Sequence, residues 1–177
     1  EQGIDGKGVD IDEDMVNFCN SKAFDVVQMD AILYLDGLED KSLGGIFIDQ
    51  VVEHLEPNYL IKMIGLCYKK LIYGGSIVVE TVNPLSFHSF ANFYIDMSHK
   101  RPVHPETLRF LLEAKGFREI ESHFFAALPE DQRLIGMEID PSTDEKEKRA
   151  IKTYNYNIDM LNKTLFGSQD YAIVGRK

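Results

Sequence analysis

Short apolar runs alternate with segments of helical periodicity along most of this chain. The runs at 24–29 and 45–48 are brief and bounded by polar residues, as expected of buried strands. Residues 57–71 instead repeat their apolar side chains at steps of three and four, which predicts a helix packed along one face. Pro57 fits the first position of that helix, and the Gly74-Gly75 pair predicts its end.

The same alternation continues toward the carboxyl end. Further strands are predicted at 7–10, 76–81, 118–125 and 171–175, and another helix begins at Pro105 and ends at Gly116. Strands that alternate with helices of this length indicate an α/β fold. We expect a mostly parallel sheet with helices on both faces and right-handed crossovers.

The part of the chain at about 128–167 departs from this alternation. A polar, irregular stretch at 129–144 leads into a predicted helix at 145–165. Because a plain hairpin suffices to join the last two strands, we interpret this segment as a helical insertion in a single domain spanning 1–177. The helix can pack on its own domain, cover a neighbouring pocket or form a homodimer interface, and packing on its own domain is the default. Its apolar stripe consists of Ile151, Tyr154, Ile158, Leu161 and Leu165.

Composition narrows the class of protein. The 177 residues are 44% hydrophobic and 27% charged, the balance of an ordinary folded domain. Because 29 acidic residues outnumber 19 basic ones, a nucleic-acid partner is disfavoured. No apolar run reaches the roughly 20 residues of a transmembrane helix, so we expect a cytoplasmic protein. Cys19 and Cys67 lack CxxC spacing and are interpreted as reduced packing residues.

Two acidic residues stand where predicted strands end. Ligands of such sheets bind at the carboxyl ends of the strands. Asp10 ends the strand at 7–10, where a carboxylate can accept hydrogen bonds from both hydroxyls of a ribose; the alternative, capping the next helix, suits Asp12 better. Asp30, followed by Ala31, is placed either to face the polar edge of an adenine or to cap a helix.

Four segments taken in order carry a family resemblance. Gly8-Val9-Asp10-Ile11, Asp30-Ala31, the 50–55 run with Glu53-His54, and the 74–79 segment resemble successive motifs of class I S-adenosylmethionine-dependent methyltransferases. The resemblance extends from Gly3 to about Phe125. It implies a Rossmann-like, doubly wound, mostly parallel seven-stranded sheet whose last strand is antiparallel, with S-adenosylmethionine as the cofactor. The implied cofactor-binding residues are Asp10 and Ile11 at the ribose, Asp30 and Ala31 near adenine, and Gln50 and Val51 beside the methionine portion.

One departure from the family pattern is large. In nucleotide-binding crossovers a glycine-rich turn precedes the ribose acid by about 20 residues. Only nine residues precede Asp10 in this chain. We therefore expect the first strand and the glycine-rich loop to be missing from it. That strand belongs in the middle of the sheet, so its neighbours should lack main-chain partners and the cofactor site should be incomplete.

The acceptor side is indicated by residues 96–106, which are similar to a segment of methyltransferases of surface-glycan and O-antigen biosynthesis. This similarity implies methyl transfer to a hydroxyl of a sugar or glycan, or of another small molecule. Such a hydroxyl must lose a proton, and a neutral histidine suits that task. His99 is the first choice for a catalytic base and His104 the second, although fixing the start of the next helix explains His104 equally well.

Four further residues are candidates for binding the acceptor. Arg101 is placed to hold an anionic group or to form a surface ion pair, and Tyr94 to stack on a sugar or to pack on a helix face. No metal is predicted, because the histidines near Asp96 and Glu106 lack a recognised ligand spacing. The full substrate-binding set is His54, Asn83, Tyr94 and Arg101.

Two other functional classes compete with the enzyme. A catalytically inactive, methyltransferase-like interaction module has the same fold but a degenerate glycine loop. A nicotinamide-dependent oxidoreductase shares the acid at the strand end. The 50–55 run and the lack of a suitably placed Tyr-xxx-Lys pair count against the oxidoreductase.

Overall fold

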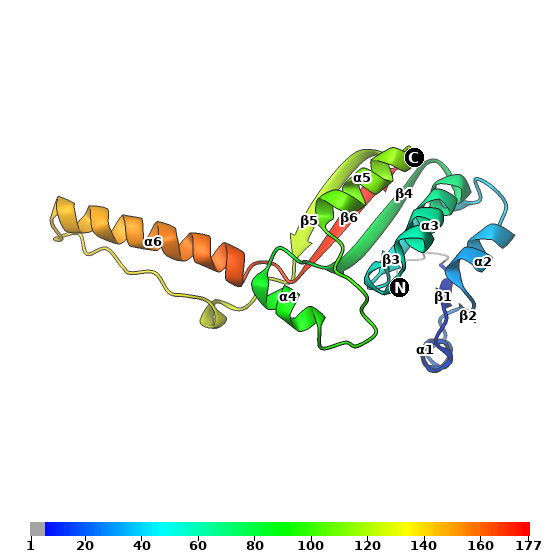
Figure 1. The fold of residues 1–177 in the computed structure, drawn as a ribbon, viewed down its shortest axis with the longest axis horizontal. Coiled ribbons are helices and arrows are strands. Elements are labelled where there is room, and N and C mark those ends of the chain that lie inside the picture. Colours follow the sequence, from blue (N-terminus) through cyan, green and yellow to red (C-terminus); the bar gives the residue numbers. More distant parts are fainter. Residues whose placement is uncertain (1–5) are drawn as a thin grey trace.

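The computed structural model describes residues 6–177 and arranges their six strands in two sheets (Figure 1). A parallel pair stands apart from a four-stranded sheet of order β3-β4-β6-β5, in which β3 and β4 are parallel and β6 is antiparallel to both neighbours. The α/β class and the antiparallel last strand are confirmed, whereas one continuous sheet is not observed. The strands are β1 (Gly8–Asp10), β2 (Val26–Gln28), β3 (Leu43–Asp49), β4 (Leu71–Val82), β5 (Arg118–Phe125) and β6 (Asp170–Arg176).

The helices begin and end largely where the sequence predicts. Asp12 and Asp30 are N-caps whose carboxylates accept main-chain hydrogen bonds. Gly116 ends its helix with a φ of 111°, a conformation that glycine adopts without strain. The helices are α1 (Glu13–Ser21), α2 (Ala31–Gly37), α3 (Pro57–Lys70), α4 (Phe87–Phe93), α5 (Pro105–Lys115) and α6 (Glu145–Leu165), with 3₁₀ turns at Val52–His54 and Glu130–Gln132.

The junction between α3 and β4 corrects one prediction. The sequence pattern includes Leu71 in the helix, but α3 ends at Lys70 and Leu71 begins β4, where it pairs with Leu43. A buried apolar residue satisfies either periodicity, so the pattern does not distinguish the two. Gly74, with a φ of 77°, lies at the irregular stretch of β4 where the register against β3 shifts.

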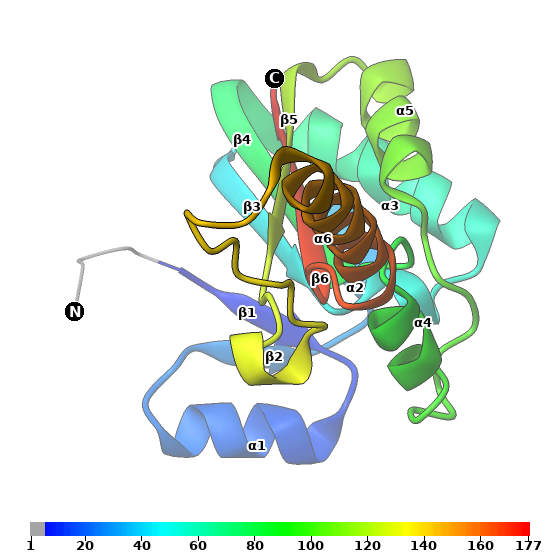
Figure 2. The same cartoon turned by 90° about the vertical axis from the view of Figure 1, so that its left-hand side faces the viewer.

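The hydrophobic core lies between the four-stranded sheet and the helices α3 and α5 (Figures 1 and 2). Ile77 and Ile173 from the sheet are completely buried against this layer. On the opposite face Phe47 is 61% exposed and Val78 is half-buried. Within residues 6–177 the helices therefore cover one face of this sheet, and the prediction of cover on both faces is wrong for this part of the chain.

Residues between β5 and β6 form an arm that projects from the sheet, with α6 as its long axis (Figure 1). The Asn155 amide bonds to both N and O of Met137, and the Asn162 amide to both N and O of Leu134. Each side-chain amide thus bonds to both main-chain groups of one residue, as a neighbouring strand would, and holds the connecting segment along the helix.

The apolar stripe of α6 is only partly covered. Ile151 and Ile158 are buried, whereas Tyr154 and Leu161 remain 44% and 45% exposed. The expected packing of α6 on its own domain thus accounts for only part of its apolar stripe. None of the helices in residues 6–177 combines the length and apolar character needed to cross a bilayer.

Candidate functional site

Asp10 and Asp30 lie at the same edge of the small sheet, because β1 and β2 are parallel. Asp10 Oδ1 accepts a hydrogen bond of 2.9 Å from the main-chain N of Asp12. Asp12 itself caps α1, accepting from Met15 N at 2.9 Å. Capping of α1 therefore belongs to Asp12, and in residues 6–177 no donor bonds to Oδ2 of Asp10.

Asp30 uses both carboxylate oxygens within the protein. Oδ1 accepts from Leu33 N at 3.0 Å, and Oδ2 accepts from the Tyr59 hydroxyl at 2.7 Å. These bonds, with that from Leu33 the larger influence, hold the pKa of Asp30 below its usual value. Because Tyr59 belongs to α3, this carboxylate ties the small sheet to the main core. Contact of Asp30 and Ala31 with adenine stays a prediction.

Gln50 follows β3 in a backbone conformation that is uncommon for a residue other than glycine, with a φ of 48°. Its main-chain N donates to Glu80 O at 3.0 Å, and its Nε2 donates to Asp170 Oδ1 at 3.4 Å. Backbone strain of this kind concentrates at functional sites. Beside these polar groups, the side chains of Ile11 and Val51 expose apolar surface at the strand ends.

Three carboxylates gather where β3, β4 and β6 meet. Burial, followed by repulsion from Asp49 and Asp170, raises the pKa of Glu80. Burial is also the largest cause that raises the pKa of Asp170, with Asp49 adding to it and the Gln50 amide opposing it. Close carboxylates raise one another's pKa because their ionised forms repel, so this corner of the site favours a cationic group nearby. Sequence reasoning missed Asp170, which is 120 residues away from Gln50 in the chain.

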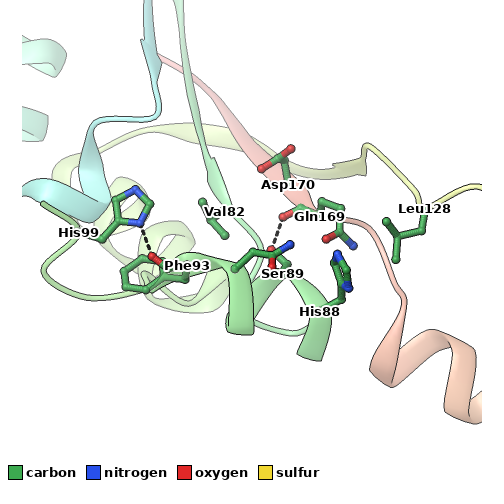
Figure 3. Close-up of a pocket in the computed structure, with 9 residues that line it drawn as sticks. Val82, His88, Ser89, Phe93, His99, Leu128, Gln169 and Asp170 are labelled. Carbon is green, nitrogen blue, oxygen red and sulfur yellow. Dashed lines mark hydrogen bonds between the residues drawn. The ribbon is translucent and has the colours of Figure 1, made fainter. Parts of the chain in front are cut away.

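A pocket of about 350 Å³ opens between the end of β4, helix α4 and the start of β6 (Figure 3). His99 lies at one end of this pocket, and His88 and Leu128 lie at the other. Sequence reasoning selected His99 but found no pattern around His88. The lining residues are Val82, His88, Ser89, Asn92, Phe93, His99, Leu128, Gln169 and Asp170.

The hydrogen bonds of His99 fix its neutral tautomer. Its Nδ1 lies 2.7 Å from the carbonyl O of Phe93, which can only accept, so Nδ1 carries the hydrogen. The lone pair of the neutral ring is then on Nε2, which lies 3.8 Å from Asp96 Oδ2. The ring also stacks on Phe93 with centroids 4.5 Å apart. His99 is therefore positioned to accept a proton at Nε2 beside a carboxylate.

His54 lies directly beside His99. The two ring centroids are 4.7 Å apart, and His54 Nδ1 lies 3.0 Å from Ser98 Oγ. The preceding residue anchors the acceptor segment, because Glu53 O accepts from the main-chain N of Lys100 and of Arg101. The 3₁₀ turn after β3 and the segment around His99 thus form one unit.

His104 serves a local structural purpose. Its Nδ1 accepts a hydrogen bond of 3.1 Å from Glu106 N, at the start of α5. That bond uses the lone pair that a base needs, because the other ring nitrogen of a neutral imidazole then carries the hydrogen. Fixing the helix start is the role that the geometry supports, and catalysis by His104 stays an untested prediction.

Three other predicted acceptor residues lie outside the pocket lining. Asn83 is buried, and its amide bonds to Ser168 O and Leu85 N. Tyr94 is exposed and makes edge contacts with Phe90 and Phe93. The side chain of Arg101 is exposed. Hydrogen bonds within the protein account for the position of Asn83, and aromatic packing accounts in part for that of Tyr94. Binding of an acceptor by these residues is untested.

Comparison with solved structures identifies proteins of the same fold. A S-adenosylmethionine-dependent methyltransferase from Archaeoglobus fulgidus is 48% identical, with a TM-score of 0.93. The match covers 99% of this chain and 77% of that protein. No protein-family model matches the chain, and neither does any curated protein.

Two more distant structures share the fold alone. A Thermotoga maritima S-adenosylmethionine-dependent methyltransferase, named as a possible histamine N-methyltransferase, is 18% identical with a TM-score of 0.66, covering 97% of this chain and 72% of that one. The Burkholderia thailandensis 1,6-didemethyltoxoflavin-N1-methyltransferase, solved with 1,6-didemethyltoxoflavin and S-adenosylhomocysteine, is 12% identical with a TM-score of 0.56. That match covers 99% of this chain and 62% of the enzyme.

The match to the archaeal enzyme extends over both the strand ends and the pocket, and the comparisons give no support to an inactive interaction module. From the 48% identity over nearly the whole chain, together with the ordered acids at the strand ends, this protein belongs to the S-adenosylmethionine-dependent methyltransferases, with S-adenosylmethionine as its cofactor.

Proposed function

We propose that this enzyme methylates a hydroxyl of a sugar, glycan or similar small molecule bound in the pocket beside His99. The composition of the pocket wall carries the proposal: hydroxyl, amide, imidazole and carboxylate groups alternate with apolar side chains, as suits a neutral polyhydroxyl acceptor. None of the nine lining residues is lysine or arginine, which disfavours a phosphorylated acceptor. The similarity of residues 96–106 to glycan methyltransferases supports the same class.

His99 acts in this proposal as the base for the acceptor hydroxyl. Nδ1 donates to Phe93 O, so Nε2 has the lone pair, and Asp96 is placed to stabilise the imidazolium that forms. The methyl group then passes from the sulfonium to the acceptor oxygen in line, and the sulfur leaves as a neutral thioether. Alignment of the three atoms is the remaining task of the protein.

Methyl transfer from labelled S-adenosylmethionine to a panel of sugars, glycans, amines and phosphorylated sugars tests the acceptor class. We expect product with neutral hydroxyl acceptors, and His99→Ala should lower kcat on the order of a hundredfold with cofactor affinity retained. His123→Ala is the matched control, because this histidine is exposed on β5 and pairs with Glu121. Transfer confined to amines would exclude a hydroxyl acceptor, and a wild-type rate in His99→Ala would exclude the base.

The cofactor lies, in this proposal, across the carboxyl ends of β1, β2 and β3. Asp10 binds the ribose hydroxyls, with Ile11 beside it. Asp30 and Ala31 face adenine, and Gln50 and Val51 contact the methionine portion. The carboxylates near Gln50 suit the positively charged sulfonium and ammonium groups of S-adenosylmethionine.

Two neighbouring acids provide a sharp test of this placement. Asp10→Ala should weaken S-adenosylmethionine binding about ten- to hundredfold in calorimetry, because a charged hydrogen-bond acceptor is lost. Asp12→Ala should instead lower stability by about 1 kcal/mol through loss of the α1 cap, with the dissociation constant unchanged. Equal effects of the two substitutions on binding would refute the ribose role of Asp10.

We further propose that one more parallel strand, with a glycine-rich turn, lies between β1 and β3 and completes the cofactor site. In the described part of the chain β1 pairs only with β2, and β3 only with β4, although both belong to one α/β architecture. Hydrogen exchange tests this: main-chain amides of β3 that do not bond to β4 should be protected, and free exchange would contradict the added strand.

We also propose that the α6 arm pairs two copies of the chain. The proposal is supported by the projection of the arm from the sheet (Figure 1). The apolar side chains of Tyr154 and Leu161, which remain exposed along α6, support it as well. Leu161→Asp should shift the mass measured by light scattering from dimer to monomer. A monomeric wild-type protein would exclude this arrangement.

A further inference from the structure

Three potential ligand groups converge where the turn after β3 meets the segment around His99. Glu53, His54 and His99 each offer one ligand atom, and these atoms all lie within 4.8 Å of one another. They come from two segments that are more than 40 residues apart in the chain. The methyl-transfer chemistry proposed above uses His99 alone and leaves the other two groups without a role.

Glu53 is the most informative member of this group. Its side chain is completely buried, and Oε2 accepts a hydrogen bond of 2.8 Å from Thr81 Oγ1. Oε1 is buried as well, but it has no hydrogen-bond partner within residues 6–177. A buried carboxylate oxygen is costly without a partner, because water no longer solvates its charge. An unpartnered, buried carboxylate oxygen, in a side chain that offers a ligand atom within 4.8 Å of a nitrogen of each imidazole, therefore indicates a positively charged occupant.

The hydrogen bonds of the two histidines leave the same nitrogen available on each ring. His99 Nδ1 donates to the carbonyl O of Phe93. Ser98 Oγ donates to Asp96 Oδ1 at 2.6 Å, so it receives the hydrogen of His54 Nδ1. Both rings consequently have their lone pair on Nε2. Metal-binding histidines are held in this way, with the outer ring nitrogen donating to a carbonyl or to a polar relay.

We propose that Glu53 Oε1, His54 Nε2 and His99 Nε2 bind a divalent cation of the zinc type. Two imidazole nitrogens and one carboxylate oxygen form a donor set that zinc accepts, with a fourth position left open. Around such an ion neighbouring ligand atoms lie roughly 3.3–3.5 Å apart. Side-chain rotations that move the ligand atoms by about 1 Å therefore bring them to this spacing. Asp96 Oδ2, 3.8 Å from His99 Nε2, offers a further carboxylate oxygen.

This cation site goes beyond methyl transfer. A bound cation links the end of β3 to the acceptor segment and borders the pocket through His99. It also takes the lone pair that otherwise accepts a proton, so cation and proton exclude each other at Nε2. Failure of the cation site would leave the base role of His99 intact, since that role needs only the bond to Phe93 O.

Zinc titration of chelator-treated protein by calorimetry, with the visible spectrum of the cobalt-loaded protein, tests the site. We expect one ion per chain and the absorption of a four-coordinate cobalt centre. His54→Ala and His99→Ala should each weaken binding on the order of a hundredfold, since each removes a direct ligand. His123→Ala, which removes a histidine from β5 instead, should bind like the wild type.

Glu53→Gln is a further variant, because its amide oxygen can still accept from Thr81 while the charge is lost. Its fold, like that of each histidine variant, is checked by circular dichroism and thermal melting. A folded wild-type protein that binds no zinc in stoichiometric amount would overturn the proposal. Equal affinity of wild type, His54→Ala and His99→Ala would overturn it too, because the ion would then bind elsewhere.

Discussion

The two sheets of this protein differ in what they contribute. The four-stranded sheet supplies the completely buried residues Ile77, Val79 and Ile173, and packs against α3 and α5. The β1–β2 pair is only three residues long on each strand, and its residues are half-buried or exposed. Yet this small sheet ends in the acids proposed to bind the cofactor. The buried core and the two acids proposed to bind ribose and adenine therefore lie in different parts of the molecule.

Such a division has a physical basis. A ligand-binding edge must keep polar groups accessible, and it therefore cannot bury them in a dense core. Tyr59 joins the two parts, because it donates to Asp30 from α3 and accepts from Ile32 N at 3.3 Å. The small sheet is thus held by a few specific bonds rather than by extensive apolar packing.

Matched core substitutions should show the largest contrast. Ile173→Ala is expected to lower the free energy of unfolding by about 2–5 kcal/mol, because it leaves a cavity at a completely buried position. Val27→Ala in β2 should cost about 1 kcal/mol or less, since its side chain is only half-buried. Urea unfolding measures both. If Val27→Ala lowered the free energy of unfolding as much as Ile173→Ala, the two sheets would not differ in their contribution to stability.

Tyr59→Phe should weaken the link between the small sheet and the core, because both hydrogen bonds of the hydroxyl are lost. We expect the free energy of unfolding to fall by about 1–2 kcal/mol, an intermediate effect. The pKa of Asp30 is lowered in the folded protein, so its ionised form adds stability above the unfolded pKa of about 3.9. That stability is lost as the pH falls through the lowered pKa.

In Tyr59→Phe the pKa of Asp30 rises toward its ordinary value, so the loss of stability on acidification should be shallower than in the wild type. Unfolding at pH 6 and pH 3 measures the difference. The bond from Leu33 N remains in the variant and should preserve part of the dependence. An unchanged acid dependence would show that Tyr59 does not act on Asp30.

Asp170→Asn should have the smallest effect on stability and the opposite sign. The pKa of Asp170 is raised, so the favourable contribution of its protonated form is present below the unfolded pKa and lost as the pH rises through the folded pKa. At pH 7 the variant should be more stable than the wild type, with a free energy of unfolding that is higher by less than about 1 kcal/mol after solvent screening. A higher melting temperature in a thermal melt would show this. At pH 3 the difference should disappear. A less stable variant at pH 7 would contradict the cost that burial, with repulsion from Asp49 added, imposes on the ionised form of Asp170.

Local sequence signals predicted much of this fold and part of the site. Asp12, Asp30 and Gly116 are found where their types predict helix boundaries, because caps depend on bonds within about three residues. The order of the strand-end motifs identified the methyltransferase class, and the choice of His99 came from its segment. The end of α3 was predicted wrongly at Leu71, where a buried apolar residue fits either a helix or a strand.

Long-range groupings escaped prediction, since nothing local marks them. Asp170 meets Gln50 only because β6 lies beside β4, and His88 enters the pocket only through the position of α4. The sequence also argued against a metal, because the histidines near Asp96 and Glu106 have no recognised ligand spacing, while Glu53-His54 and His99 are far apart along the chain. Their convergence requires the segment after α4 to dock on the main-chain O of Glu53.

The sequence by itself determined the alternation of strands and helices, the helix caps and the order of the cofactor motifs, because all of these depend on neighbours along the chain. Only the tertiary structure decided that the strands form two sheets, that the α6 arm projects, and which groups surround His99. Those features depend on which surfaces pack together and on which buried polar atoms find partners. Neither condition can be read from local spacing.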